Sequence, residues 1–314
     1  MNRLLPALAA AALLLAAASC NNKDYNPGNP APQPVVKKTI QDIYNQLRPQ
    51  TKSVSIDAAT GGTFRGNSGT RYQFPPNAFV TQAGLPVTGA VDVRVIEALT
   101  HSQMMFGKML PVSNGQGLVS GGEARVQAFQ NGQELRIAPG ATYRINMPYG
   151  GANGANMQRF MGENTVDTTT TLVNWNPAPQ DSVSSGAVVY NGDTLTIISD
   201  SLTWENCDYF SGNTNLQIFT VTVAGPDSLS GQNAATYALF DGLNTLMPIY
   251  PSAGMTYNIN NMPNIPMHFI CFAVVDGQFY GGILAATPTT GNTYTVTLTA
   301  QDPVAFAAAV DALP

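Results

Sequence analysis

The side chains that could support catalysis or bind a metal are few and scattered along the chain. Histidine occurs twice, at His101 in an expected turn and at His268 before an apolar segment. Neither has a second ligand at the short spacing that a zinc site needs. Glu205 and Asp208 are the one close pair of carboxylates, and no calcium-type D-x-D-x-D-G loop or G-x-S-x-G nucleophile motif occurs. We therefore predict no metal site, no cofactor and no enzyme activity.

The N-terminal residues predict a different kind of chemistry, at Cys20. Met1 to Ser19 contain one cation, Arg3, then an Ala/Leu run and small residues, which is the order of regions in a signal peptide. The apolar run is shorter than the roughly 20 residues of a membrane-spanning helix. Residues 17–20 resemble a lipobox, in which a peptidase cleaves before a cysteine that carries diacylglycerol. We expect Cys20 to be lipidated; the alternative is an ordinary signal peptide that leaves Cys20 free.

The other two cysteines, Cys207 and Cys271, form an even pair once Cys20 is assigned to the anchor. Outside the cytoplasm such a pair can be oxidised if the fold brings its Cα atoms within about 7 Å. Two buried free thiols explain the sequence equally well. Both alternatives remain open at this point.

Composition limits the partners of the chain. Residues 21–36 are rich in Asn and Pro and lack the apolar side chains needed to fold, which is typical of an extended tether. Charged residues are 11% of the chain and the net charge is −5, whereas about 25% of residues are charged in an average globular protein. We expect no nucleic-acid partner, because there is no basic stripe to neutralise phosphates. The expected partners are a membrane, through the lipid, and an envelope protein or glycan.

Hydrophobic periodicity predicts an all-β fold with a short helix at each end. Residues 37–50 have one apolar helical face, and Asp302 followed by Pro303 is typical of a helix start. Between them, apolar and polar residues alternate in short segments, as in 90–96 and 124–129, separated by glycine turns such as Asn131-Gly132. This pattern indicates two antiparallel β-sandwich-like domains.

We expect five segments along the chain. They are the signal peptide (1–19), a lipidated Cys20 with the tether and first helix (20–50), a first sandwich (51–178), a linker or bridging strand (179–200), and a second β domain with the C-terminal helix (201–314). The Pro/Ser/Gly-rich composition near 177–193 suggests the boundary. The apolar segment 195–198 is compatible with either domain.

Several motifs resemble those of known β-sandwich proteins. The segments 61–64 (GGTF) and 74–78 (FPPNA) resemble the start of the domain shared by ankyrins, netrin receptors and zonula-occludens proteins. With the segments 118–122, 157–160 and 204–210, the chain resembles envelope lipoproteins of Bacteroidetes-type bacteria. The resemblance implies a non-enzymatic β-sandwich for protein contacts. It also implies an outer-membrane location, with which Asn21 after the anchor is compatible on either face.

Aromatic residues beside glycines or acids are the candidates for recognition. We expect a binding surface from Tyr149, Trp204, Tyr209, Phe279 and Tyr280. Packing of the same rings across a sheet is the alternative. The expected function is a membrane-anchored binding or scaffolding module of the cell envelope. The alternative is a secreted-type hydrolase or carbohydrate-processing accessory protein at the cell surface.

Overall fold

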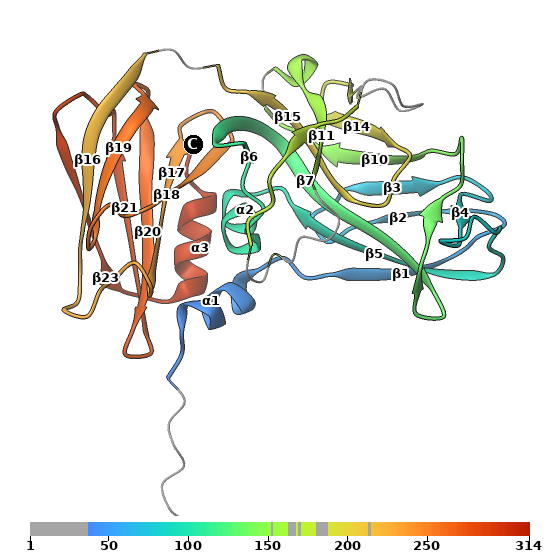
Figure 1. Cartoon of the computed structure of the whole chain (residues 1–314), viewed down its shortest axis with the longest axis horizontal. Helices are drawn as coiled ribbons and strands as arrows, with labels where there is room; N and C mark the ends of the chain where they lie inside the picture. The colour runs from blue at the N-terminus through green and yellow to red at the C-terminus, as the bar shows by residue number, and fades with distance from the viewer. Residues whose placement is uncertain (1–36, 152, 163–167, 169–170, 180–187, 213–214) are drawn as a thin grey trace, which may run out of the picture. The chain divides into compact units, whose positions relative to one another are not determined.

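The computed structural model describes residues 37–151, 153–162, 168, 171–179, 188–212 and 215–314 (Figure 1). The predicted signal peptide, Cys20 and the tether lie outside these residues. No helix among the described residues has both the length and the apolar character to cross a membrane.

The described chain is mostly β, as the sequence predicts. Sheets 1 and 2 form a first sandwich. Sheet 1 contains β1 (Lys52–Asp57), β5 (Ala90–Ala98), β7 (Gln116–Gln130), β15 (Trp204–Phe210), β11 (Gln158–Gly162) and β12 (Asn176–Pro177) in that order, with β6 (Val112–Ser113) and β8 (Gln133–Glu134) paired to β7. Sheet 2 contains β13 (Val188–Tyr190), β14 (Thr194–Ser199), β10 (Tyr143–Pro148), β3 (Arg71–Phe74) and β2 (Gly62–Arg65). A small pair, β4 (Phe79–Val80) with β9 (Arg136–Ile137), and a 3-10 turn at Gly154–Asn156 complete this half.

Sheets 3 and 4 form a second sandwich. Sheet 3 contains β18 (Thr245–Ile249), β17 (Ala234–Phe240), β20 (Met267–Val275), β21 (Gln278–Ala286) and β23 (Thr299–Ala300). Sheet 4 contains β19 (Thr256–Pro263), β16 (Leu216–Ala224) and β22 (Thr293–Thr297). The pairs are antiparallel as expected, except that β16 and β22 run parallel.

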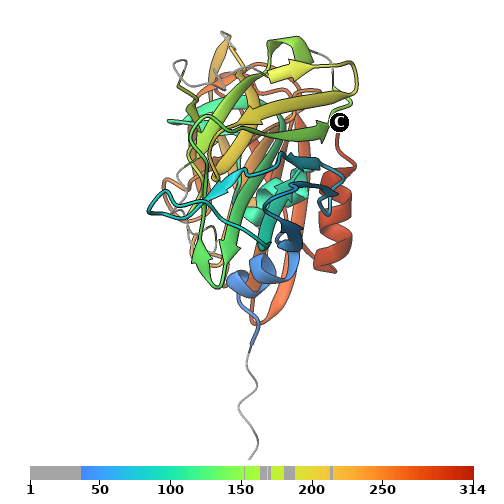
Figure 2. The ribbon, with the colours of Figure 1, turned by 90° about the vertical axis from the view of Figure 1, so that its right-hand side faces the viewer.

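Three helices, α1 (Ile40–Leu47), α2 (His101–Gly107) and α3 (Pro303–Asp311), share a core with sheets 1 and 3. Phe106 of α2, Phe272 of β20 and Trp204 of β15 belong to this central core, while separate cores fill each sandwich. Figures 1 and 2 both show α1 beside α3, so the first and last helices of the described chain pack together. The helices therefore form a layer between sheet 1 and sheet 3.

The helices at the two ends are confirmed, whereas α2 was not predicted. Asp302 accepts hydrogen bonds from the N–H groups of Val304 and Ala305, with Pro303 at the first helical position. The turn predicted at His101 is instead the start of α2, which Thr100 and Gln103 cap reciprocally. This capping box satisfies two N–H groups that a helix end leaves unpaired.

Strand pairing differs from the predicted division of the chain. The segment expected as a linker or bridging strand contains β14, whose apolar residues 195–198 were compatible with either domain and pair with β10 in sheet 2. Strand β15, expected in the second domain, pairs with β7 and β11 in sheet 1. The strands of the first sandwich therefore continue to Phe210, and those of the second begin at Leu216.

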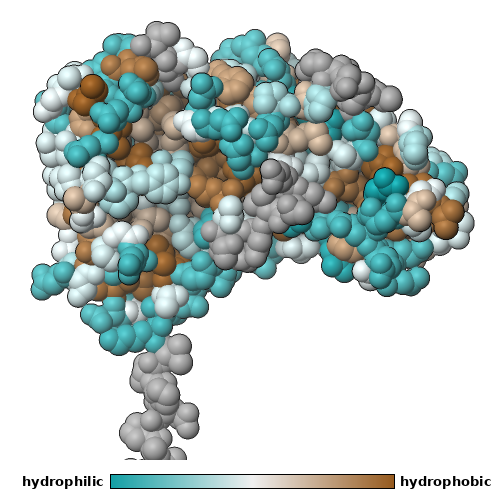
Figure 3. All heavy atoms as spheres, viewed as in Figure 1, coloured by the Kyte–Doolittle hydropathy of each residue, from teal (hydrophilic) through white to brown (hydrophobic). Residues whose placement is uncertain are grey.

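The surface agrees with the low content of charged residues. On the face drawn in Figure 3, hydrophilic residues surround separate apolar patches, with no continuous apolar area. Two exposed apolar side chains, Leu216 and Ile218, lie near the start of β16.

Candidate functional site

The structure buries two of the five aromatic residues that were expected at a binding surface. Trp204 is 0% exposed, with its ring edge-on to Trp175 and the Arg125 guanidinium over it. Phe279 is 4% exposed and packs against Phe306 of α3. The prediction is wrong for both, because the helical layer covers the faces of sheets 1 and 3 that carry them. Tyr280 is half-buried against the core of the second sandwich.

The remaining two aromatic residues, Tyr149 and Tyr209, come together at one cavity of about 380 Å³, which we call the tyrosine pocket. It lies where the start of α2 and the end of α3 meet β7. Besides the tyrosines, its lining includes His101, Ser120 and Asn244. Burial raises the pKa of Tyr149. The pocket therefore combines two phenols with an imidazole, a hydroxyl and an amide.

His101 lines the tyrosine pocket, and its surroundings shift the pKa of its imidazole. Its Nδ1 lies 3.4 Å from the carbonyl oxygen of Val310. Burial lowers the pKa of the imidazole, although the Val310 carbonyl and the negative charge of Asp311 oppose that effect. Ser102 and Asp311 are already hydrogen-bonded to each other, at 2.8 Å. The arrangement positions the ring, but it does not place a hydroxyl nucleophile on it.

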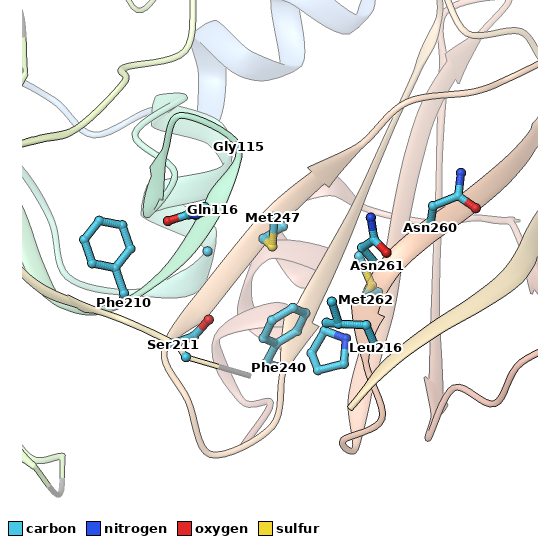
Figure 4. Close-up of a pocket in the computed structure, with 13 residues that line it drawn as sticks. Gly115, Gln116, Phe210, Ser211, Leu216, Phe240, Met247, Asn260, Asn261 and Met262 are labelled. Atoms are coloured by element: carbon cyan, nitrogen blue, oxygen red, sulfur yellow. The ribbon is translucent and has the colours of Figure 1, made fainter. Parts of the chain in front are cut away.

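A second and larger cavity, of about 610 Å³, crosses from the first sandwich to the second (Figure 4). We call it the amide groove. Its lining residues are Gly115, Gln116, Gly117, Phe210, Ser211, Gly212, Leu216, Phe240, Met247, Asn260, Asn261, Met262 and Pro263. Figure 4 shows Phe210 and Gln116 on one side, Asn260 and Asn261 on the other, and Met247 between them. All of the side chains that line this groove are uncharged.

Local backbone features present the polar groups of the amide groove. Gly115 has φ of +81°, which a turn between β6 and β7 requires and which glycine adopts without strain. Asn261 has φ of +62°, at the irregularity where the register between β16 and β19 shifts. Asparagine tolerates this conformation better than most residues. The turn at Gly115 and the strand irregularity at Asn261 therefore leave amide side chains at the rim of the groove, while Phe210 remains 43% exposed.

The two cysteines are not paired. Cys207 and Cys271 are both buried free thiols. Cys207 belongs to the core of the first sandwich and Cys271 to that of the second. The disulfide alternative is therefore wrong, because the helical layer and two sheets separate the thiols. Burial raises the pKa of both, which keeps them protonated and unreactive.

Glu205 and Asp208 do not form a common acidic surface. Glu205 points into the first sandwich, where the Nε and Nη2 atoms of Arg159 bind its two oxygens, each at 2.7 Å. Ser199 donates a third hydrogen bond to it, at 2.6 Å. Asp208 lies on the opposite face of β15. Both carboxyl groups are 0% exposed, so neither can contact a substrate in this structure.

His268 lies at ion-pair distance from Asp241, a contact that the sequence did not predict. Its Nδ1 lies 2.6 Å from Oδ1 of Asp241, at the turn between β17 and β18. Among the described residues this is the one hydrogen bond of the ring, and no hydroxyl or thiol joins it. The described residues also contain no group of three or more His, Cys, Asp and Glu side chains that could hold a metal ion.

Comparison with known proteins adds no assignment. No protein family and no curated protein matches the chain.

Proposed function

We propose that this protein is a non-enzymatic binding module, held at the cell envelope by a lipid on Cys20, and that the amide groove binds a neutral glycan. The N-terminal sequence and the resemblance to envelope lipoproteins support the location, at the outer membrane. The amide groove supports the ligand class. The observation that carries the proposal is the exposed ring of Phe210 opposite uncharged amides in one groove.

The chemistry of the groove suits a sugar better than a charged ligand. A primary amide both donates and accepts hydrogen bonds, which matches the two roles of a sugar hydroxyl. The apolar C–H face of a sugar ring packs on a flat aromatic side chain. Because no lining residue is charged, the groove has no cationic side chain to pair with a phosphate or a carboxylate. A few fixed polar groups on an apolar wall are typical of ligand sites.

Calorimetric titration of the full chain, purified in detergent, with maltoheptaose, cellohexaose and xylohexaose tests the groove. We expect at least one of these oligosaccharides to bind. Phe210→Ala and Asn260→Ala should weaken that binding at least about tenfold, or roughly 1.4 kcal/mol. Leu85→Ala, at a 64% exposed apolar residue away from the groove, is the matched control and should bind as the wild type does. Equal binding by the Phe210 variant would contradict the proposal.

A separate experiment tests the anchor. Mass spectrometry of the N-terminal peptide from cells should show an acylated Cys20, and Cys20→Ser should move the chain from the membrane fraction to the soluble fraction. An unmodified N-terminus in the medium would contradict the location and would leave the groove assignment intact.

A further inference from the structure

A buried acidic cluster lies between sheet 1 and the helices, next to the tyrosine pocket, whose lining includes one residue of the cluster, Ser120. We define it as Ser120 and Glu123 of β7 and Asn206 and Asp208 of β15, all buried. Both carboxylate oxygens of Glu123 and the Oδ1 atom of Asp208 have no hydrogen-bond partner. An unpartnered buried carboxylate is costly, and native structures almost always satisfy it.

A β-bulge brings these four side chains to one face of the sheet. Residues 120 and 123 are three apart, so in a regular strand they would point to opposite faces. The register instead pairs Asn206 with Glu123 and Asp208 with Ser120, which leaves one extra residue on β7. Gly122 provides it with φ of +123°, where any side chain would also meet Leu99. The bulge therefore assembles the cluster.

The hydrogen bonds within the cluster leave three carboxylate oxygens without a partner. Nδ2 of Asn206 donates to Oδ2 of Asp208 at 2.6 Å, which leaves Oδ1 of Asp208 unpartnered. The Ser120 hydroxyl donates to Oδ1 of Asn206 at 3.4 Å and accepts from the Gly122 N–H at 3.1 Å. Two oxygens bound to one ion at about 2.4 Å and a right angle are about 3.4 Å apart. The spacing is that of neighbouring ligands.

Burial shifts the pKa of both carboxyl groups in the cluster. Burial raises the pKa of Glu123 well above its usual value, and the negative charge of Asp208 raises it further. Burial likewise raises the pKa of Asp208, against hydrogen bonds from Ser120, Asn206 and Gly121. Arg125, two residues along β7, has its guanidinium over the Trp204 ring at 5.2 Å. Two carboxylates would give the cluster a charge that a divalent cation cancels.

We propose that Glu123 and Asp208, with Oδ1 of Asn206 and Oγ of Ser120, form a calcium-binding site. These side chains offer six hard oxygen atoms, and Ca²⁺ takes six to eight oxygens in flexible geometry. A softer metal would need thiolate or imidazole ligands, and Cys207 points to the other face of β15. Ser120 also lines the tyrosine pocket, which provides a route from solvent. All four side chains come from sheet 1, so the site would hold β7 and β15 together at the bulge, independently of the amide groove.

Equilibrium dialysis of the full chain in detergent against ⁴⁵Ca²⁺, after stripping with chelator, tests the site. We expect one Ca²⁺ per chain in the wild type, and binding about 100-fold weaker in Glu123→Gln and in Asp208→Asn. Asp92→Asn, which removes a partly exposed carboxylate of the same sheet, is the matched control and should bind as the wild type does. Calcium should raise the melting temperature of the wild type and of Asp92→Asn, but not that of Glu123→Gln or Asp208→Asn.

Melting of the wild type in calcium and in chelator keeps the test independent of how well the variants fold. Identical melting temperatures with no bound ⁴⁵Ca²⁺ would overturn the proposal, and would mean that the two carboxyls share protons instead. Equal binding by Glu123→Gln would overturn it too. Binding of Mg²⁺ as tight as that of Ca²⁺ would overturn the assignment to calcium.

Discussion

Strand β15 carries buried carboxyl groups on both faces, and the two groups differ in their hydrogen-bond and charge partners. Glu205 faces the first sandwich, where Arg159 and Ser199 satisfy both of its oxygens. Asp208 faces the helical layer, where it meets Glu123 and keeps one unpartnered oxygen. The Arg159 guanidinium opposes the rise in pKa that burial imposes on Glu205. Burial alone therefore does not define a site: both oxygens of Glu205 are hydrogen-bonded within the chain, whereas three carboxylate oxygens of the acidic cluster have no hydrogen-bond partner.

Removal of the internal partner should have the largest effect. Arg159→Met leaves Glu205 buried without its cation, so we expect a loss of about 3–5 kcal/mol in the free energy of unfolding. Urea denaturation measures it. The double variant Arg159→Met/Glu205→Leu removes both charges and should recover most of the loss. If the double variant is as unstable as the single one, packing around Arg159 and not its charge stabilises this face.

Neutralisation of the acidic cluster should have a smaller effect of the opposite sign. In chelator, Glu123→Gln removes a buried carboxyl group whose oxygens have no hydrogen-bond partner, so we expect stability equal to or up to about 1 kcal/mol above that of the wild type. The same denaturation assay measures it. A loss of 3 kcal/mol or more, in the range expected for Arg159→Met, would mean that the chain itself already compensates Glu123 and that the two faces do not differ.

Sequence patterns predict the two faces of β15 only in part. Alternation identifies 204–210 as a strand, yet it cannot say which face meets helices, so Trp204 was placed at a surface and Glu205 was grouped with Asp208. The residues Gly121-Gly122-Glu123 contain the signal for a bulge, but its effect depends on pairing with β15, which the sequence does not specify. Thr100 and Gln103 are a readable capping box for α2. The amide groove joins residues from segments around 115, 210, 247 and 260, and local patterns do not predict such an assembly.

His101 provides a third case, a partly buried titratable group whose pKa the fold lowers. The other titratable groups at the tyrosine pocket are Asp311 on α3, Tyr149 and Tyr209. Because burial lowers its pKa in the fold, the unfolded chain binds the proton more tightly. Stability should therefore be fully present above about pH 6.5 and fall as the pH drops through that value. The partly exposed ring makes this effect smaller than that of the buried carboxylates.

Denaturation midpoints from pH 8 to pH 5 measure the contribution of His101. His101→Gln cannot titrate, so its profile should be flatter than that of the wild type. His268→Gln leaves His101 in place and should keep the fall that His101 causes. A steeper acid loss in His101→Gln than in the wild type would show that the imidazole is stabilised in its charged form, as a surface histidine beside Asp311 would be.

The smallest loss of stability is expected when the ion pair between Lys37 and Asp276 is removed, although its length is close to that of the Arg159–Glu205 pair. Nζ of Lys37 lies 2.9 Å from Asp276, but both side chains are largely exposed, at 64% and 75%. Water and salt screen such a pair, and holding two long side chains in one geometry costs entropy. Lys37→Ala should therefore reduce stability by less than about 1 kcal/mol, and the difference should vanish in high salt. A larger, salt-independent loss would show that Lys37 acts through packing near Gly277, and that exposure is not what separates the two pairs.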